Sequence, residues 1–309
     1  MIGELRAIVG AEACLVRPGE LFAYECDGLT LEPQRPLAVV LPSTTEELAA
    51  IVRACRAHGV AFVPRGAGTG LSGGAQPVER SVLIECSRMN RVLEVDAQNR
   101  LAVVQPGVVN AALSAEVAPL GLFYAPDPSS QQACTIGGNV AENSGGPHTL
   151  KYGTTTNHVL ALEMVLPDGE VVRFGNRVGE SVGYDLVGAI VGSEGTLGIV
   201  TEVTVRLTPI PAAIETMLAI FDDVVAACRA VGRVIRSGVV PAAMEIVDHR
   251  TIEAVEASVY AAGLPTSAGA VLIVELDGDP AGLPSEIDTI RGACEAEGCQ
   301  TIERARDEA

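Results

Sequence analysis

The chain is poor in basic and aromatic residues. Its 309 residues include 21 Lys and Arg against 39 Asp and Glu, which gives a formal net charge of −18, and only 3% are aromatic, with no tryptophan. Nucleic acids and anionic membrane surfaces recruit basic patches, so this balance argues against both as partners. Since 48% of the residues are nevertheless hydrophobic, we expect a substantial α/β core made mostly of aliphatic side chains.

Long apolar runs and metal-ligand spacings are also missing. No run approaches the roughly 18 apolar residues of a membrane helix, and no basic stretch followed by an apolar one opens the chain. The eight cysteines form no C-x-x-C pair, and the four histidines show no metal-ligand spacing. We therefore predict no metal site, no disulfide framework and no membrane insertion. We expect a cytoplasmic protein, with attachment to a membrane through partner subunits left open.

Glycine, by contrast, is concentrated in one loop after a short apolar run. Five of the nine residues from Gly66 to Gly74 are glycine. Such a loop brings unshielded backbone N–H groups close to a ligand, which suits a phosphate. The candidate contacts are Pro64, Arg65, Gly66, Ala67, Gly68, Thr69, Gly70, Leu71 and Ser72.

Two familiar phosphate-binding motifs do not account for this loop. A Walker loop requires Lys-Ser/Thr after its last glycine, where this chain has Ala75-Gln76. Gly68-x-Gly70-x-x-Gly73 spells the dinucleotide fingerprint, but the next strand is expected at Ser81–Ile84. The interval holds no crossover helix, so a Rossmann fold is not expected.

Two further glycine-rich segments follow, at 135–146 and 192–202. Three such segments, spread over more than a hundred residues, favour a long, extended ligand rather than a mononucleotide. In combination they resemble the FAD-binding domain of the vanillyl-alcohol-oxidase, or PCMH, family. Within that family the chain is most similar to the FAD subunit of glycolate oxidase and to D-lactate and D-2-hydroxyglutarate dehydrogenases, over roughly residues 20 to 300.

The resemblance implies FAD as the cofactor, with the first segment at the pyrophosphate, the second along the diphosphate and isoalloxazine, and the third near the flavin and adenosine. The first segment lacks the histidine that tethers the flavin in some members, so non-covalent FAD is implied. Besides the first-loop residues, the implied contacts are Pro126, Thr135, Gly137, Gly138, Asn139, Ala141, Asn143, Gly145, Gly153, Glu194, Gly195, Gly198, Ile199 and Val200.

Hydrophobic patterns divide the chain near Thr208-Pro209-Ile210-Pro211. Before it, we predict a strand at 37–41, a helix from Ser43 to His58 with a Ser43/Glu46 capping box, a hairpin around Asp168-Gly169 and a strand at 199–207. After it, strands and helices alternate, with a helix expected at 249–262. The predicted fold is α+β: a PCMH-type FAD-binding domain of two α/β subdomains (1–210), then an incomplete ferredoxin-like cap over the substrate (211–309).

The leading functional hypothesis is oxidation of a D-2-hydroxy acid, of the glycolate or D-lactate type, by hydride transfer to FAD. An iron–sulfur subunit that accepts the electrons is the partner implied by the resemblance. The His- and Glu-bearing motifs of the related enzymes lie beyond the last residue of this sequence, so we assign no catalytic residue. The alternative hypothesis is a non-catalytic, flavin-binding subunit or fragment that requires a separate C-terminal piece.

Overall fold

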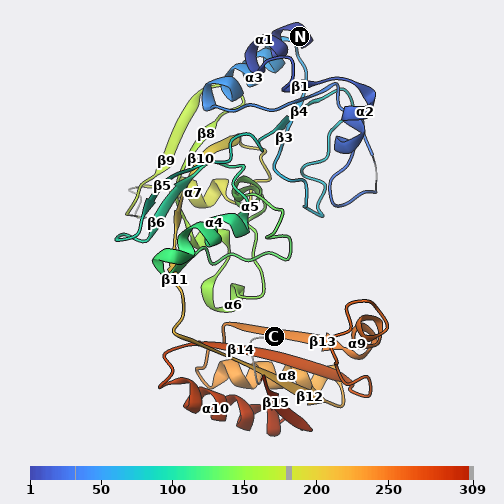
Figure 1. Ribbon diagram of the computed structural model, residues 1–309, viewed down its shortest axis with the longest axis vertical. Helices are drawn as coiled ribbons and strands as arrows, with labels where there is room; N and C mark the ends of the chain where they lie inside the picture. The colour runs from blue at the N-terminus through green and yellow to red at the C-terminus, as the bar shows by residue number, and fades with distance from the viewer. Residues whose placement is uncertain (32, 179–182, 306–309) are drawn as a thin grey trace. The chain divides into compact units, whose positions relative to one another are not determined.

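The computed structural model describes residues 1–31, 33–178 and 183–305. It contains two compact units (Figure 1): Met1–Gly146 with Thr154–Pro209, and Pro147–Gly153 with Ile210–Ala309. Both units mix helices and strands, as the sequence predicts. The assignment of 1–210 to the cofactor and 211–309 to a cap stays a prediction.

The first unit begins with a small mixed sheet in the order β1-β2-β4-β3, in which β2, β4 and β3 are parallel. The predicted strand–helix–strand element is present, and the first glycine-rich loop starts at the carboxyl end of β3. The elements of this part are α1 (Ile2–Val9), β1 (Cys14–Leu15), α2 (Pro18–Leu21), the 3-10 helix η1 (Phe22–Tyr24), β2 (Ala38–Val40), α3 (Thr45–Ala57), β3 (Phe62–Arg65) and β4 (Val82–Glu85).

The N-cap of helix α3 lies one residue later than predicted. Thr44, rather than Ser43, is the N-cap, and its hydroxyl accepts a hydrogen bond from Glu47 N at 3.2 Å. The Glu47 carboxylate in turn accepts from Ser43 N at 2.7 Å. The capping-box prediction at Ser43 and Glu46 was therefore wrong by one position, because adjacent Ser and Thr residues offer equivalent caps.

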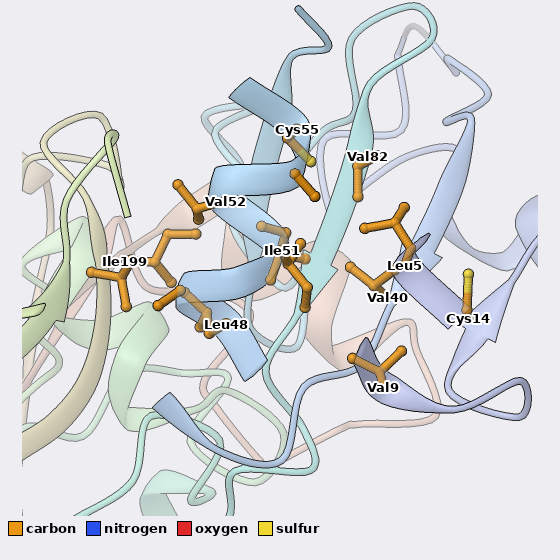
Figure 2. Packing of buried hydrophobic residues seen from close by; sticks show 14 of the residues in the cluster. Leu5, Val9, Cys14, Val40, Leu48, Ile51, Val52, Cys55, Val82 and Ile199 are labelled. Carbon is orange, nitrogen blue, oxygen red and sulfur yellow. The ribbon is translucent and has the colours of Figure 1, made fainter. Parts of the chain in front are cut away.

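Helix α3 packs on two sides at once (Figure 2). Leu48 and Val52 lie on the side of Ile199, while Ile51 lies toward Leu5 and Val40, and all belong to one buried cluster. Leu48 is fully buried, and truncating such a side chain to alanine costs about 2–5 kcal/mol. Helix α3 thus joins the small sheet to the strand that carries Ile199.

That strand lies in an antiparallel sheet ordered β5-β6-β10-β8-β9. The predicted hairpin is confirmed as β8 and β9, and the predicted strand at 199–207 as β10. The elements of this part are β5 (Val92–Asp96), β6 (Leu101–Val104), α4 (Asn110–Val117), the 3-10 helix η2 (Ala118–Leu120), β7 (Leu122–Phe123), α5 (Ile136–Glu142), the 3-10 helix η3 (Thr155–Asn157), β8 (Val159–Val165), β9 (Val171–Gly175), α7 (Leu186–Ile190), β10 (Ile199–Arg206) and β11 (Thr208–Pro209).

The second unit has the ferredoxin-like arrangement that the sequence predicts. Its antiparallel sheet runs β13-β14-β12-β15, and α8 and α10 cover one face (Figure 1). The elements are α6 (Thr149–Tyr152), β12 (Ala213–Phe221), α8 (Val224–Arg236), β13 (Ala243–Asp248), α9 (His249–Glu256), β14 (Ala270–Gly278), α10 (Leu283–Glu295) and β15 (Thr301–Arg304).

Helix α9 is shorter than the predicted 249–262. It ends at Glu256, whose carboxylate accepts hydrogen bonds from the backbone N–H groups of Ala262 and Leu264, both at 2.9 Å. The side chain thereby supplies acceptors for a returning loop, which the hydrophobic pattern did not reveal.

A buried carboxylate reinforces the junction between α3 and the large sheet. Glu163 on β8 is 8% exposed and accepts hydrogen bonds from the hydroxyls of Thr45 and Thr201, both at 2.9 Å. Arg173 on β9 donates to the same carboxylate at 2.6 and 2.8 Å. Four donors therefore compensate the desolvated charge and connect α3 to β8, β9 and β10.

We predict that Glu163→Gln lowers the melting temperature by several degrees at neutral pH. Burial acts to raise the pKa of Glu163, but hydrogen bonds from Arg173, Thr201 and Thr45 hold it below its usual value. A lowered carboxyl pKa stabilises the fold above the unfolded-state pKa, and this contribution is lost as pH falls through the folded-state pKa. Thermal melts should show the largest difference from the wild type near neutrality and a smaller one below about pH 4. A difference independent of pH would contradict this role.

Candidate functional site

A cavity of about 360 Å³ lies in the first unit, where the three glycine-rich segments meet. Its walls come from the loop after β3, from helix α5 with the residues before it, and from the turn between α7 and β10. The predicted contacts that line it are Pro64, Arg65, Gly66, Ala67, Gly68, Thr69, Gly70, Leu71, Thr135, Gly137, Gly138, Asn139, Ala141, Glu194, Gly195, Gly198, Ile199 and Val200.

The first and second segments pack with no room for a side chain between them. A Cβ atom at Gly66 would lie 2.4 Å from the Thr135 hydroxyl, far inside van der Waals contact. Thr135 is the N-cap of α5, and its hydroxyl accepts from Gly138 N at 3.3 Å. The first loop therefore lies directly against the start of α5, whose first two N–H groups donate to backbone carbonyls outside the helix, both at 2.8 Å.

The third segment is fixed to the end of α5 by backbone hydrogen bonds. Gly192 N donates to Val140 O at 2.8 Å, and Glu194 N donates to Ala141 O at 2.9 Å. A Cβ at Gly195 would lie 2.6 Å from Pro64 Cγ, so the third segment also touches the first. The three segments thus form one continuous wall.

Arg65 is the only basic residue among the described residues that line the cavity. Its side chain is 9% exposed, and Nη1 donates to Cys26 O at 2.8 Å and to Ala75 O at 3.4 Å. The guanidinium also lies 5.7 Å from the centre of the Tyr24 ring. Arg65 therefore spans the base of the glycine-rich loop and places a positive charge beside the cavity.

Asn139 supplies an unused polar group. Its side-chain nitrogen is buried, and among the described residues it has no hydrogen-bond acceptor apart from a weak interaction with the Cys134 thiol. Leaving such an amide without a partner is costly, so the position favours an acceptor atom from a bound ligand. The acidic side chains at the cavity, Glu142 and Glu194, are exposed.

Five predicted contacts do not line the cavity: Ser72, Pro126, Asn143, Gly145 and Gly153. Ser72 donates to the Glu142 carboxylate at 2.9 Å, while Gly153 belongs to the second unit. Their contact with a cofactor stays a prediction. The lining residues that the sequence did not single out as contacts are Gly74, Ala75, Cys86, Pro106, Ser129, Ser130, Val140, Glu142, Ser144, Ile190 and Ser193. Cys134 also lines the cavity, and the sequence favours flavin contact and a buried structural role for this thiol equally.

None of the four histidines lines the cavity. His58 pairs with Glu4 at 2.9 Å and His148 with Glu275 at 2.8 Å, and a ring nitrogen of His249 lies 2.9 Å from Ala268 O. His158 is buried beside the Tyr124 ring. Across residues 1–31, 33–178 and 183–305, no cluster of three or more His, Cys, Asp and Glu has the arrangement of a metal site.

Solved structures share this architecture. The chain matches an alkyldihydroxyacetonephosphate synthase with a TM-score of 0.83 and 22% identity, over all of this chain and 61% of that one. It matches p-cresol methylhydroxylase with a TM-score of 0.80 and 19% identity, over 98% of this chain and 65% of that one. At these identities the likeness establishes the fold, which is that of the PCMH-type FAD-binding proteins.

Sequence comparisons define the family more closely. Residues 36–175 match the FAD binding domain, and residues 210–309 match the C-terminal domain of FAD linked oxidases. The glycolate oxidase subunit GlcD of Escherichia coli K12 is 46% identical over 290 residues, 94% of this chain and 58% of the relative. The D-lactate dehydrogenase of Anaerostipes hadrus is 36% identical over 251 residues, 79% of this chain and 53% of the relative. The chain therefore carries an FAD binding domain and the C-terminal domain of FAD linked oxidases, and its cofactor is FAD.

The chain spans 58–61% of the length of the first curated relatives that it matches.

The residues of the cavity fit FAD on structural grounds. Backbone N–H groups at glycines suit a diphosphate, and Arg65 adds a positive charge. The buried side-chain nitrogen of Asn139 has only the weakly accepting Cys134 thiol beside it, so it remains a donor for the cofactor.

We predict that Gly70→Val abolishes FAD retention without unfolding the protein. A Cβ at Gly70 meets no atom of the chain within 4 Å, so the added side chain would compete only with a ligand. Gly68 is a poorer test, because a Cβ there would lie 2.2 Å from the Arg65 guanidinium. Gly3→Val, at a glycine that is equally open but remote from the cavity, serves as the control. Full FAD occupancy in Gly70→Val, measured by visible absorbance per polypeptide, would contradict the placement.

Proposed function

We propose that this chain is the FAD-binding part of an oxidoreductase that oxidises a D-2-hydroxy acid of the glycolate or D-lactate type. The observation that carries the proposal is the three-segment cavity, in a chain 46% identical to a glycolate oxidase subunit. The D-lactate dehydrogenase and a D-2-hydroxyglutarate dehydrogenase of Xanthomonas citri, 38% identical over 216 residues, support the same substrate class. These substrates share a carboxylate next to a carbon that bears a hydroxyl.

In this reaction a hydride leaves C2 of the hydroxy acid, and bound FAD supplies the two-electron acceptor. The backbone amides of Gly66–Ser72 would hold the diphosphate, and the Arg65 guanidinium beside them would oppose its negative charge. Local groups must provide this attraction because the whole chain carries a net charge of −18. Asn139 would donate its side-chain N–H to an acceptor atom of the cofactor.

We propose that the cofactor is bound without a covalent link. The two thiols at the cavity are poor nucleophiles: burial raises the pKa of Cys86 to about 12 and also raises the pKa of Cys134. Both are protonated at neutral pH, and no histidine lines the cavity. Acid precipitation of the protein should therefore release all of the yellow colour into the supernatant. A coloured pellet would contradict this.

The base that removes the hydroxyl proton is not assigned. Among the residues of 1–31, 33–178 and 183–305 that line the cavity, the carboxylates are Glu142 and Glu194, both exposed, and no histidine is present. This observation favours a second candidate function, that of a flavin-holding subunit whose reaction depends on groups outside this chain.

One experiment separates the two functions. The FAD-loaded chain is mixed with glycolate, D-lactate or L-lactate under anaerobic conditions, and the visible flavin bands are followed. Bleaching by glycolate or D-lactate, with L-lactate as the stereochemical control, is expected for the oxidoreductase. Bands that persist with all three acids would contradict it and support the flavin-holding subunit.

We further propose that electrons leave to a partner, of the iron–sulfur type, within a multi-subunit enzyme in the cytoplasm. The support is that the relatives from Escherichia coli and Bacillus subtilis are named as subunits of glycolate oxidase. All eight cysteines are free thiols, as expected in a reducing compartment. In the described parts of the chain, no helix combines the length and apolarity needed to cross a bilayer. Co-purification of the tagged chain with a brown, iron-containing subunit would support the partner, and recovery without one would contradict it.

A further inference from the structure

A short segment that precedes the matched FAD binding domain contacts the first glycine-rich loop. The match begins at residue 36, after Gly28, and both Gly28 and the loop belong to the first unit. Gly28 N donates to Gly68 O at 2.8 Å. A Cβ atom at Gly28 would lie 2.7 Å from Gly70 O and 2.9 Å from Thr69 O, well inside van der Waals contact. The carbonyl oxygens of three consecutive loop residues therefore gather at Gly28.

The N–H groups of the same three peptides point the other way. In a trans peptide, the carbonyl oxygen of one residue and the N–H of the next lie on opposite sides of the bond. The N–H groups of Thr69, Gly70 and Leu71 therefore face away from Gly28. All three residues line the cavity, whereas Gly28 does not. Across the described residues, none of these three N–H groups has a hydrogen-bond acceptor.

Little else holds the middle of this loop. Within the described parts of the chain, the bond from Gly28 N is the only backbone hydrogen bond made by Gly68, Thr69 or Gly70. The φ angle of Gly28 lies outside the left-handed region, so alanine at this position would be opposed by the loop and not by its own backbone. The contact itself therefore requires glycine.

Asp27 sets the orientation of Gly28. Its Oδ1 atom accepts a hydrogen bond from Leu29 N at 3.0 Å, which closes an Asx turn around Gly28. Asp27 is 5% exposed, and its Oδ2 atom has no donor among the described residues. On the other side of Asp27, Cys26 O accepts from Arg65 Nη1 at 2.8 Å. The turn is thus attached to the loop on both sides of Asp27.

We propose that Gly28, oriented by Asp27, is a positioning residue for the FAD diphosphate. By gathering the carbonyl oxygens on one side of the loop, it turns the N–H groups of Thr69, Gly70 and Leu71 toward the cavity. Successive N–H groups that point the same way form a concave site for an anion. Gly28 touches no ligand and acts through the loop alone. The inference rests on the proposed FAD site.

The test compares FAD dissociation constants, from fluorescence titration of the apoprotein, for the wild type, Gly28→Ala and Gly19→Ala. The methyl group of Gly28→Ala displaces the carbonyl oxygens and turns the N–H groups away from the diphosphate. Since a hydrogen bond to a charged group is worth about tenfold in affinity, binding should weaken about tenfold or more. Gly19→Ala is the matched control, because a Cβ there meets no atom within 4 Å. A folded Gly28→Ala with wild-type affinity would overturn the proposal.

Phosphorus NMR separates positioning from a general loss of stability. At saturating FAD, the diphosphate resonances of Gly28→Ala should differ from those of the wild type, because the donors around the phosphates have moved. Gly19→Ala should keep the wild-type resonances. Wild-type resonances in a Gly28→Ala protein that binds FAD more weakly would mean that the substitution only destabilises the fold, and the proposal would fall.

Two variants of Asp27 test the turn. Asp27→Ala removes the acceptor of the Asx turn and should weaken FAD binding several-fold. Asp27→Asn keeps an oxygen acceptor at the same place, and the atom that it replaces, Oδ2, accepts no hydrogen bond from the described residues. Asp27→Asn should therefore retain wild-type affinity. Equal affinities for the two variants would overturn the role of Asp27.

Hydrogen exchange on the wild-type protein keeps the proposal testable if Gly28→Ala does not fold. Added FAD should slow exchange of the amides of Thr69, Gly70 and Leu71, and unchanged rates there would overturn the proposal. A wild-type chain that binds no FAD at all would instead remove the proposed FAD site, and that outcome is recognisable before any variant is made.

Discussion

Close contact between a glycine of one segment and a side chain of the next is the constraint on which the cavity depends. Gly66 meets the cap of α5 at Thr135, and Gly195 meets Pro64, in each case at a distance that excludes a Cβ atom. Two backbone hydrogen bonds then attach the third segment to the end of α5. The glycines therefore act twice: they let the three segments close into one wall, and in the first loop they leave backbone N–H groups unshielded by side chains, which suits a diphosphate.

This wall is positioned from outside by packing and by buried polar groups. Helix α3 holds the small sheet, and with it the first loop, against the strand that begins with Ile199 (Figure 2), while Glu163 adds four hydrogen bonds to the same junction. In an acidic chain, such preorganisation is the physical alternative to a basic binding surface, because the ligand finds donors already in place.

The sequence predicted the local elements well, because their signals are local. The helix predicted from Ser43 to His58, the Asp168-Gly169 hairpin and the strand predicted at 199–207 all depend on neighbouring residues. The combination of three glycine-rich segments indicated the FAD family, and 18 of the 23 contacts that it implied line one cavity. Helix α5 was missed, since glycines mask its pattern. Pro106 and Ile190 were missed because only tertiary packing brings them to the site, and the pairing of Lys151 with Asp277 joins positions 126 apart.

The central claim is that the three segments together bind one extended FAD, and an experimental structure of the chain with FAD bound tests it most directly. The account predicts the diphosphate within hydrogen-bond distance of the backbone amides of Gly66–Ser72 and an acceptor atom of the cofactor beside Asn139 Nδ2. A dinucleotide bound outside this cavity, or one that contacts only a single segment, would contradict it.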